Sequence, residues 1–195
     1  KGEMIMLVGP SGSGKTTLLQ ILGTLENPDI KNNPELVIDN QSVIKLNDSD
    51  KSILRNKKIG FVFQFHELLP EFTAIENVCL PSWISNKNID NAREDAIKIF
   101  DELDLLKILN KRPDEMSGGE RQRVSVARSL INNPKIVFAD EPSGNLDSAN
   151  SKNLYSLFYE LRKKKECSFL IVTHDLKFAD MSDRKIVLND GKIIK

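Results

Sequence analysis

The sequence lacks the features that mark several classes of protein. Its 28 Lys and Arg residues balance 28 Asp and Glu residues, which argues against a whole-surface attraction to nucleic acid or anionic lipid. No apolar run approaches the roughly 18 residues that a membrane span needs, and the apolar segment near the start is too short for a secretory signal. We therefore expect a globular protein that does not cross a bilayer by itself and that has no nucleic-acid partner.

Cysteine is also scarce. The sequence has two, Cys79 and Cys167, and neither lies in a CxxC motif or beside other metal-ligand residue types. We expect both to be structural thiols in a protein of a reducing compartment. No internal repeat and no Pro-rich or Gly/Ser-rich linker divides the 195 residues, so we expect one compact domain.

Buried strands and amphipathic helices alternate along most of the chain. Apolar runs predict strands over residues 4–8, 59–63, 136–139, 168–172, 185–188 and 192–194. Helical patterns cover residues 16–24, 117–131 and 148–165, and a short helix follows residue 174. This alternation predicts an α/β fold with a mostly parallel sheet flanked by helices.

Two segments depart from that alternation. Short strands over residues 36–39 and 43–46 are expected with a turn at 40–42. Further on, Thr73 and Glu76 form a capping box that begins one helix, and a second helix is predicted over residues 90–110 from its apolar positions Ala96, Ile97, Phe100, Leu103 and Leu106. We expect a helical subdomain of about residues 66–116 beside an α/β core of residues 1–65 and 117–195.

A phosphate-binding motif lies between the first strand and the first helix. It is the GxxxxGK[ST] run Gly9-Pro10-Ser11-Gly12-Ser13-Gly14-Lys15-Thr16. Glycines let the backbone N–H groups point at phosphate oxygens, and the helix that follows adds the positive end of its dipole. We expect Lys15 to bridge the β- and γ-phosphates, Thr16 to ligate Mg²⁺ and Thr17 to reach the α-phosphate.

Polar residues at the ends of three other predicted strands suit the part of such a site where the metal and the attacking water lie, here called the reaction side. Asp140 is placed to hold hydrated Mg²⁺, and Glu141 to polarise an attacking water as general base. His174 follows the next strand and suits a γ-phosphate sensor, although a histidine at a strand end is more often structural. Gln64 follows the strand predicted over 59–63, where its amide can contact a metal-bound water. A glutamine at this position would not by itself indicate a binding site.

A second anion site is predicted at the start of a later helix. Ser117 is a natural N-cap, and Gly118 and Gly119 expose backbone N–H groups beyond what capping needs; a plain helix start is the alternative. One nucleotide cannot easily reach both this site and the Gly9–Thr16 loop within one subunit. A two-fold dimer solves that geometry, because each copy offers its Ser-Gly-Gly segment to the γ-phosphate held by the other.

Taken together, these motifs resemble the nucleotide-binding domain of ATP-binding cassette (ABC) proteins over essentially the whole chain. Gly9 to Thr17 resembles Walker A, Gln64 the Q-loop, Ser117 to Glu120 the signature, Ile136 to Glu141 Walker B, Gly144 to Asp147 the D-loop, and His174 the switch histidine. The resemblance implies the P-loop NTPase fold and places Glu120 and Asp147 at the nucleotide. Met116 and Glu120 differ from the family's usual Leu and Gln, but neither change removes a phosphate donor.

The resemblance implies a function as well as a fold. Residues 64–78 and 141–147 are similar to the ATPase subunits of lipoprotein-releasing systems, with macrolide-exporter and cell-division ATPases as near relatives. An ATPase using ATP and Mg²⁺ is implied, with Lys15, Gln64, Glu141 and His174 as catalytic residues. Its implied partners are a second copy, in an ATP-dependent head-to-tail homodimer, and integral membrane permease subunits, at the cytoplasmic face of the inner membrane.

Some expectations stay open at this point. A regulator of cell division acting through a membrane partner and a soluble non-transport ABC ATPase are the alternatives. Leu68, Leu69 and Phe72 either form a groove for a helix of the membrane partner or pack in the core of the helical subdomain. Family members carry an adenine-stacking aromatic on strands before Walker A, and here residues 1–8 precede Gly9, so we expect those N-terminal strands to be missing.

Overall fold

A six-stranded sheet forms the centre of the molecule. The computed structural model describes residues 2–29, 31 and 33–194. The strand order is β4-β5-β6-β1-β7-β8, and all neighbours pair in parallel except β7 and β8. The mostly parallel sheet predicted from the sequence is therefore confirmed. The strands are β1 (Met4–Val8), β4 (Ile59–Val62), β5 (Ile136–Asp140), β6 (Ser168–Val172), β7 (Arg184–Asn189) and β8 (Lys192–Ile193).

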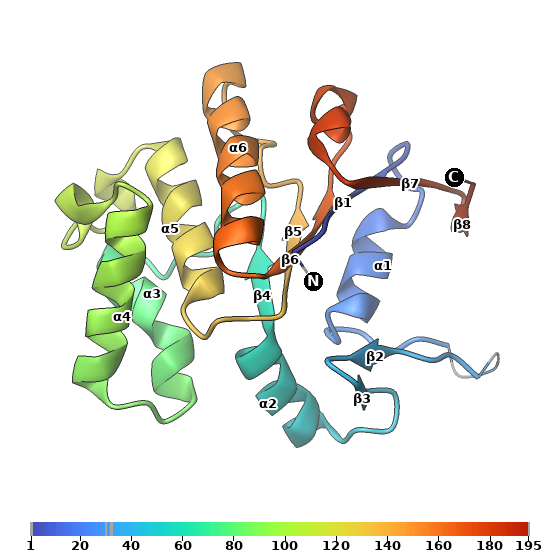
Figure 1. Cartoon of the computed structure of the whole chain (residues 1–195), viewed down its shortest axis with the longest axis horizontal. Helices are drawn as coiled ribbons and strands as arrows, with labels where there is room; N and C mark the ends of the chain where they lie inside the picture. Colours follow the sequence, from blue (N-terminus) through green and yellow to red (C-terminus); the bar gives the residue numbers. More distant parts are fainter. Residues whose placement is uncertain (1, 30, 32, 195) are drawn as a thin grey trace.

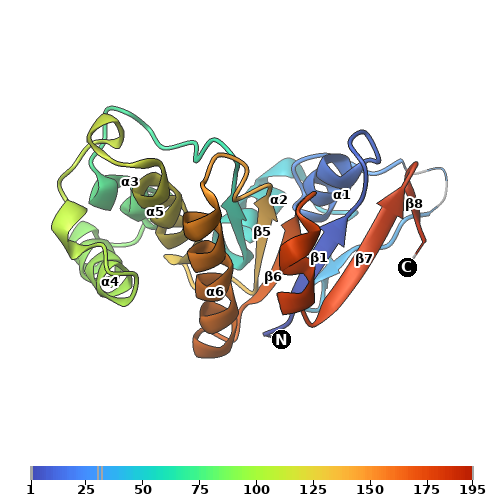
Figure 2. The same cartoon turned by 90° about the horizontal axis from the view of Figure 1, so that it is seen from above.

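Helices cover both faces of the sheet (Figure 2). The helices α1 (Lys15–Leu22) and α2 (Asp48–Lys58) lie on one face, and α6 (Ser148–Lys164) lies on the other. Successive residues of β1 alternate between the two layers, because Cβ atoms on a strand point to opposite faces. Met6 packs in the same cluster as Phe158 of α6, whereas Leu7 packs with Leu19 of α1. The sheet is thus buried on both faces, which accounts for its continuous apolar strands.

The helical part stands beside the sheet (Figure 1). It contains α3 (Ala74–Ile84) and α4 (Ile89–Glu102), and α5 (Gly118–Leu130) packs between them and the sheet. The capping box predicted before α3 is confirmed: the Thr73 N–H donates to Glu76 Oε2 at 2.7 Å, and the Glu76 N–H donates to Thr73 Oγ1 at 3.4 Å. Phe100 of α4 shares one buried cluster with the sheet, so the helical part and the sheet have a continuous core.

The predicted helix over residues 90–110 is wrong in length. Helix α4 ends at Glu102, Asp104 has a positive φ of 56°, and a 3₁₀-helix follows at Leu106–Ile108. The left-handed residue breaks the helix, so the apolar residues beyond it no longer lie on its buried face. Leu106 is 43% exposed, and Ile97 within α4 is 39% exposed, so neither belongs to the core.

The segment before β4 also differs from its prediction. The hairpin pairs β2 (Val37–Ile38) with β3 (Gln41–Ser42), and its turn is at Asp39 and Asn40, whose φ angles are 49° and 63°. Asp and Asn tolerate this left-handed backbone, which suits a two-residue hairpin turn. Residues 43–46 are described by the structure and form no strand, so that prediction is wrong. The helix α2 that follows was not predicted.

Both cysteines are free and buried, as expected of structural thiols. Burial raises the pKa of Cys79 to about 11 and that of Cys167 to about 12, so both thiols stay protonated near neutral pH. Among the described residues, the structure contains no helix with the length and apolar character needed to span a membrane.

Candidate functional site

The loop between β1 and α1 closes around the ammonium group of Lys15. Lys15 Nζ donates to the carbonyl oxygens of Gly9 at 2.9 Å and Pro10 at 2.8 Å. A Cβ atom at Gly9 would lie 2.1 Å from the backbone oxygen of Leu188 in β7, so only glycine fits there. Gly14 caps α1 with a φ of 93°, which also favours glycine. The two glycines therefore fix the curl that a phosphate cradle needs.

This loop forms the floor of a cavity of about 390 Å³. The cavity lies where β1, β5 and β6 end, at the carboxyl edge of the parallel sheet, which is the usual ligand position in open α/β sheets. Two predicted reaction-side residues, Glu141 and His174, line it together with the loop. The full lining is Ser11, Gly12, Gly14, Lys15, Thr16, Thr17, Glu141 and His174.

Ser13 belongs to the loop but not to the cavity wall. Its side chain is 2% exposed, and its Oγ has no hydrogen-bond partner within the described part of the chain. The Ser13 carbonyl accepts from the Gly191 N–H at 3.1 Å, which ties the loop to the turn between β7 and β8. The loop is therefore held in shape from the far end of the chain.

Thr16 and Asp140 supply an oxygen pair that suits Mg²⁺. Thr16 Oγ1 donates to Asp140 Oδ1 at 3.3 Å. The pKa of Asp140 is raised above its ordinary value, chiefly by burial and further by the neighbouring Glu141 charge. The hydrogen bond from Thr16 and the positive charge of Lys15 oppose this rise. Mg²⁺ is commonly bound through one or two protein oxygens, with water and substrate phosphates as its other ligands. These two side chains therefore fit the metal that the sequence predicts.

Glu141 and His174 meet across the mouth of the cavity. His174 Nδ1 lies 2.9 Å from Glu141 Oε2, and the His174 backbone N–H lies 3.4 Å from the same oxygen. Glu141 itself has a positive φ of 45°, and its N–H donates to the Val172 carbonyl at the end of β6 at 2.9 Å. The backbone of two adjacent strands thus aims a carboxylate at the cavity, and the exposed imidazole orients it.

Gln64 lies outside this group. Its side chain packs against Gly144, where an added Cβ would be 2.8 Å from Gln64 Nε2, and its carbonyl accepts from Asn145 Nδ2 at 3.1 Å. Gln64 does not line the cavity, so its roles toward the metal and the attacking water stay predictions. The sequence indicated Gln64 and residues 144–147 separately, and it did not indicate that they contact each other.

Ser117 begins α5 with a capping box. The Glu120 N–H donates to Ser117 Oγ at 3.2 Å, and the Ser117 N–H donates to Glu120 Oε2 at 2.7 Å. These hydrogen bonds to the backbone and side chain of Ser117 lower the pKa of Glu120. Ser117 is exposed, and Gly118 and Gly119 are half-buried, so this helix start is open at the surface. Ser117, Gly118, Gly119 and Glu120 do not line the Lys15 cavity.

Asp147 begins α6 close to that second site. Its side chain accepts from the Asn150 N–H at 2.8 Å and from Asn150 Nδ2 at 2.6 Å, and these bonds lower its pKa. Asn150 Oδ1 would lie 3.2 Å from a Cβ added at Gly119, so the starts of α5 and α6 touch. Sequence reasoning missed Asn150, because an Asn in the first turn of a helix carries no signal of this contact.

A sequence comparison identifies the family. The sequence model of the ABC transporter family matches residues 1–144. The chain belongs to the ABC transporter family. It is 52% identical over 194 residues to the lipoprotein-releasing system ATP-binding protein LolD of Cytophaga hutchinsonii, covering 100% of this chain and 87% of that protein. It is 50% identical to LolD of Bacteroides fragilis, covering 100% of this chain and 88% of that protein.

Solved structures agree with this family. A dimeric post-hydrolysis structure of the ATP-binding cassette MJ0796 with ADP and Pi superposes with a TM-score of 0.88 at 37% identity, covering 100% of this chain and 84% of that chain. A second dimeric structure of the same cassette gives a TM-score of 0.88 at 38% identity. The P-loop NTPase fold is thereby confirmed. The chain is an ABC ATPase, and ATP with Mg²⁺ are the cofactors of this family.

Proposed function

We propose that the chain is the ATP-hydrolysing subunit of a lipoprotein-releasing ABC transporter. The observation that carries the proposal is the convergence of Lys15, Thr16, Asp140, Glu141 and His174 at the carboxyl edge of the sheet. The lipoprotein part rests on LolD relatives that share about half of its residues over nearly their whole length.

Each residue of the cavity has a task in this proposal. Lys15 exchanges its bonds to the Gly9 and Pro10 carbonyls for the β- and γ-phosphates, while backbone N–H groups of Gly12 to Thr17 cradle the triphosphate. Thr16 and Asp140 would hold Mg²⁺, which would supply positive charge to the phosphate oxygens. Gln64, at the neighbouring strand end, would contact this metal or its water.

The hydrolysis step uses the carboxylate at the cavity mouth. Glu141 accepts a proton from the attacking water as general base, and the water oxygen forms its new bond to the γ-phosphorus as the bond to the β-phosphate oxygen breaks. His174 holds the Glu141 carboxylate through Nδ1 and faces the γ-phosphate with the other edge of its ring. Both residues leave the sheet at adjacent strand ends, so their spacing is set by rigid elements.

The second half of the site comes from another copy of the chain. Ser117, Gly118 and Gly119 offer an open helix start that their own subunit does not bring to the Lys15 cavity. In a head-to-tail homodimer, each such helix start contacts the γ-phosphate bound by the other chain, with Asp147 beside it. Contacts that exist only in the closed dimer drive closure when ATP binds, and hydrolysis reopens it.

A groove of about 470 Å³ offers a surface for the permease subunits. It lies between α2, β4, α3 and α5, and its lining includes Phe63, Glu67 and Arg128. Ile84, which is 71% exposed, also lines the groove. Phe65 is 71% exposed as well and lies in the chain between the lining residues Phe63 and Glu67, although it does not line the groove itself. Apolar side chains this exposed, in the helical subdomain of residues 66–116 and just before it, suit a segment of a membrane partner at the cytoplasmic face.

None of the three residues that the sequence suggested for a partner groove lines this one. Leu69 is 43% exposed and remains available to a partner, whereas Leu68 packs against the main core and Phe72 is half-buried. We therefore propose Leu69, Phe65 and Ile84 as the contact residues.

Two variants test the proposed function. Glu141→Gln should retain Mg·ATP binding, nearly abolish turnover and elute as a dimer in size-exclusion chromatography with light scattering; a monomer under saturating Mg·ATP argues strongly against the shared site.

Ile84→Glu should leave the ATPase activity of the isolated chain unchanged and prevent its co-purification with integral membrane subunits. If the chain captures membrane subunits but the ATPase activity of the complex does not respond to lipoprotein in liposomes, the lipoprotein assignment is overturned.

A further inference from the structure

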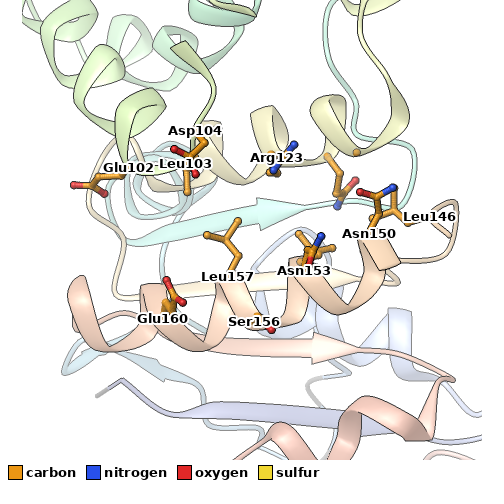
Figure 3. Close-up of a pocket in the computed structure, with 13 residues that line it drawn as sticks. Glu102, Leu103, Asp104, Arg123, Leu146, Asn150, Asn153, Ser156, Leu157 and Glu160 are labelled. Atoms are coloured by element: carbon orange, nitrogen blue, oxygen red, sulfur yellow. The ribbon is translucent and has the colours of Figure 1, made fainter. Parts of the chain in front are cut away.

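Tyr155 of α6 carries a hydroxyl group into the core of the molecule. Figure 3 shows Asn153 and Leu157 extending from α6 towards α5, where they line a cavity of about 220 Å³. Two residues correspond to about 200° of rotation on an α-helix, so Tyr155, between them, points to the other side of α6. There the residue is 0% exposed, and its ring stacks on Phe178 with the ring centroids 4.2 Å apart. A phenylalanine would pack in the same way, so the hydroxyl group needs an explanation of its own.

The hydroxyl group of Tyr155 joins two segments of the chain. Tyr155 Oη donates to Thr173 Oγ1 at 3.3 Å and lies 3.0 Å from Ser143 Oγ. A phenol has one proton to donate, so with that proton on Thr173 the Ser143 hydroxyl is the donor in the second bond. The Asp175 N–H also donates to Thr173 Oγ1, at 3.1 Å. Burial raises the pKa of Tyr155, so the phenol keeps its proton near neutral pH.

These two segments are the ones that carry Glu141 and His174. Ser143 lies in the turn that begins at Glu141, and a hydrogen bond of 3.0 Å to the Glu141 carbonyl closes this turn. Thr173 directly precedes His174 and is itself 0% exposed. Tyr155 therefore ties together, from the buried side, the backbone segments on which both members of the Glu141–His174 pair stand.

Both members of that pair depend on such support. Glu141 has a positive φ of 45°, which a residue other than glycine keeps only where its surroundings hold it. The His174 side chain is 73% exposed, so packing around the imidazole restrains it little. The 2.9 Å contact between the two side chains is therefore held mainly through the backbone beneath them.

We propose that Tyr155 is a positioning residue for ATP hydrolysis. Its hydroxyl group ties the two segments together and so holds the Glu141 carboxylate and the His174 imidazole at the spacing that the reaction uses. The inference rests on the proposed roles of Glu141 and His174. It assigns no chemical step to Tyr155 itself, which does not line the cavity around Lys15.

The test is the ATPase activity of Tyr155→Phe, with Tyr159→Phe as the matched control. Tyr155→Phe removes only the hydroxyl group, so kcat should fall by about fivefold, comparable to the net strength of one hydrogen bond, with the KM for ATP unchanged. Tyr159→Phe removes the same atom one turn later on α6, where the residue is 37% exposed, and should leave kcat unchanged. Wild-type kcat in Tyr155→Phe, or an equal loss in both variants, would overturn the proposal.

The two histidines of the chain give a second readout that needs no turnover. In protein with isotope-labelled histidine, Tyr155→Phe should shift or broaden the imidazole NMR signals of His174, because the ring loses its fixed place beside Glu141. His66, whose carbonyl accepts from Arg128 at 2.7 Å in the loop after β4, should keep its signals. A loss of stability alone would not move the native His174 signals below the melting temperature, so unmoved His174 signals would also overturn the proposal.

His174→Ala separates a failure of this inference from a failure of the proposed function. Loss of turnover in His174→Ala together with wild-type kcat in Tyr155→Phe would overturn the positioning role alone. Wild-type kcat in His174→Ala would contradict the proposed function and overturn the inference with it.

Discussion

His174 Nδ1 lies 2.9 Å from Glu141 Oε2, so the two residues form one unit at the cavity around Lys15. The contact is available because β5 and β6 are parallel neighbours, paired at Asp140 and Val172. Glu141 directly follows β5, and His174 follows β6 after one intervening residue. Their orientation therefore depends on the sheet more than on either loop.

This contact predicts a specific kinetic effect for His174→Ala. The carboxylate of Glu141 loses its orienting partner, while Lys15 and Thr16, which we propose hold the nucleotide, are untouched. We expect kcat to fall by about 10²-fold or more with a KM for ATP close to the wild-type value. Steady-state ATPase measurements check this. A rise in KM with unchanged kcat would show that His174 contributes to ground-state binding instead.

The capping boxes of α3 and α5 allow the structural and functional roles of Ser117 to be separated. Thr73 begins α3 with the same hydrogen-bond pattern as Ser117 at α5, and neither residue lines the Lys15 cavity. Ser117→Ala and Thr73→Ala should each cost about 1 kcal/mol of unfolding free energy. Only Ser117→Ala should also weaken ATP-dependent dimerisation. Equal dimerisation by both variants would leave Ser117 a plain helix cap.

Acid stability should depend on Glu76. Hydrogen bonds from the Thr73 side chain and then from its backbone hold the pKa of Glu76 below the ordinary value of 4.5. A carboxylate with a lowered pKa stabilises the fold above its unfolded pKa, and this contribution is lost as pH falls through the lower folded pKa. Glu76→Gln lacks the contribution. Its urea-unfolding free energy should therefore trail the wild type at pH 7, and the gap should close in acid; a constant gap contradicts this account.

Local sequence predicted which residues meet at the cavity around Lys15. The residues of the Gly9–Thr16 loop are contiguous, and Asp140, Glu141 and His174 each follow an apolar run that forms a strand. Parallel strands bring such ends to one edge, so their meeting follows from fold class alone. The helix α2 was missed because it buries only Leu54 among mostly charged residues, although its Asn47 cap and its acidic first turn were visible signals.

Contacts between segments that are distant in the sequence could not be predicted. Asn150 touches Gly119, and Gln64 touches Gly144, across separations that no periodicity encodes. The same applies to Gln122 on α5, whose buried amide has no hydrogen-bond partner among the described residues. The break after Glu102 was missed because an aspartate in a left-handed conformation interrupts an apolar pattern that otherwise continues.

The central claim is that each nucleotide is held between two chains, and complementation tests it most directly. Lys15→Ala disables the phosphate cradle, and Ser117→Arg blocks the open helix start, so each variant alone should be inactive. In an equal mixture, half of the dimers contain both variants, and each of these keeps one intact site, so about a quarter of all sites should be restored. ATPase activity of the mixture near that level is the predicted result. Activity no greater than the sum of the two variants alone would contradict the account.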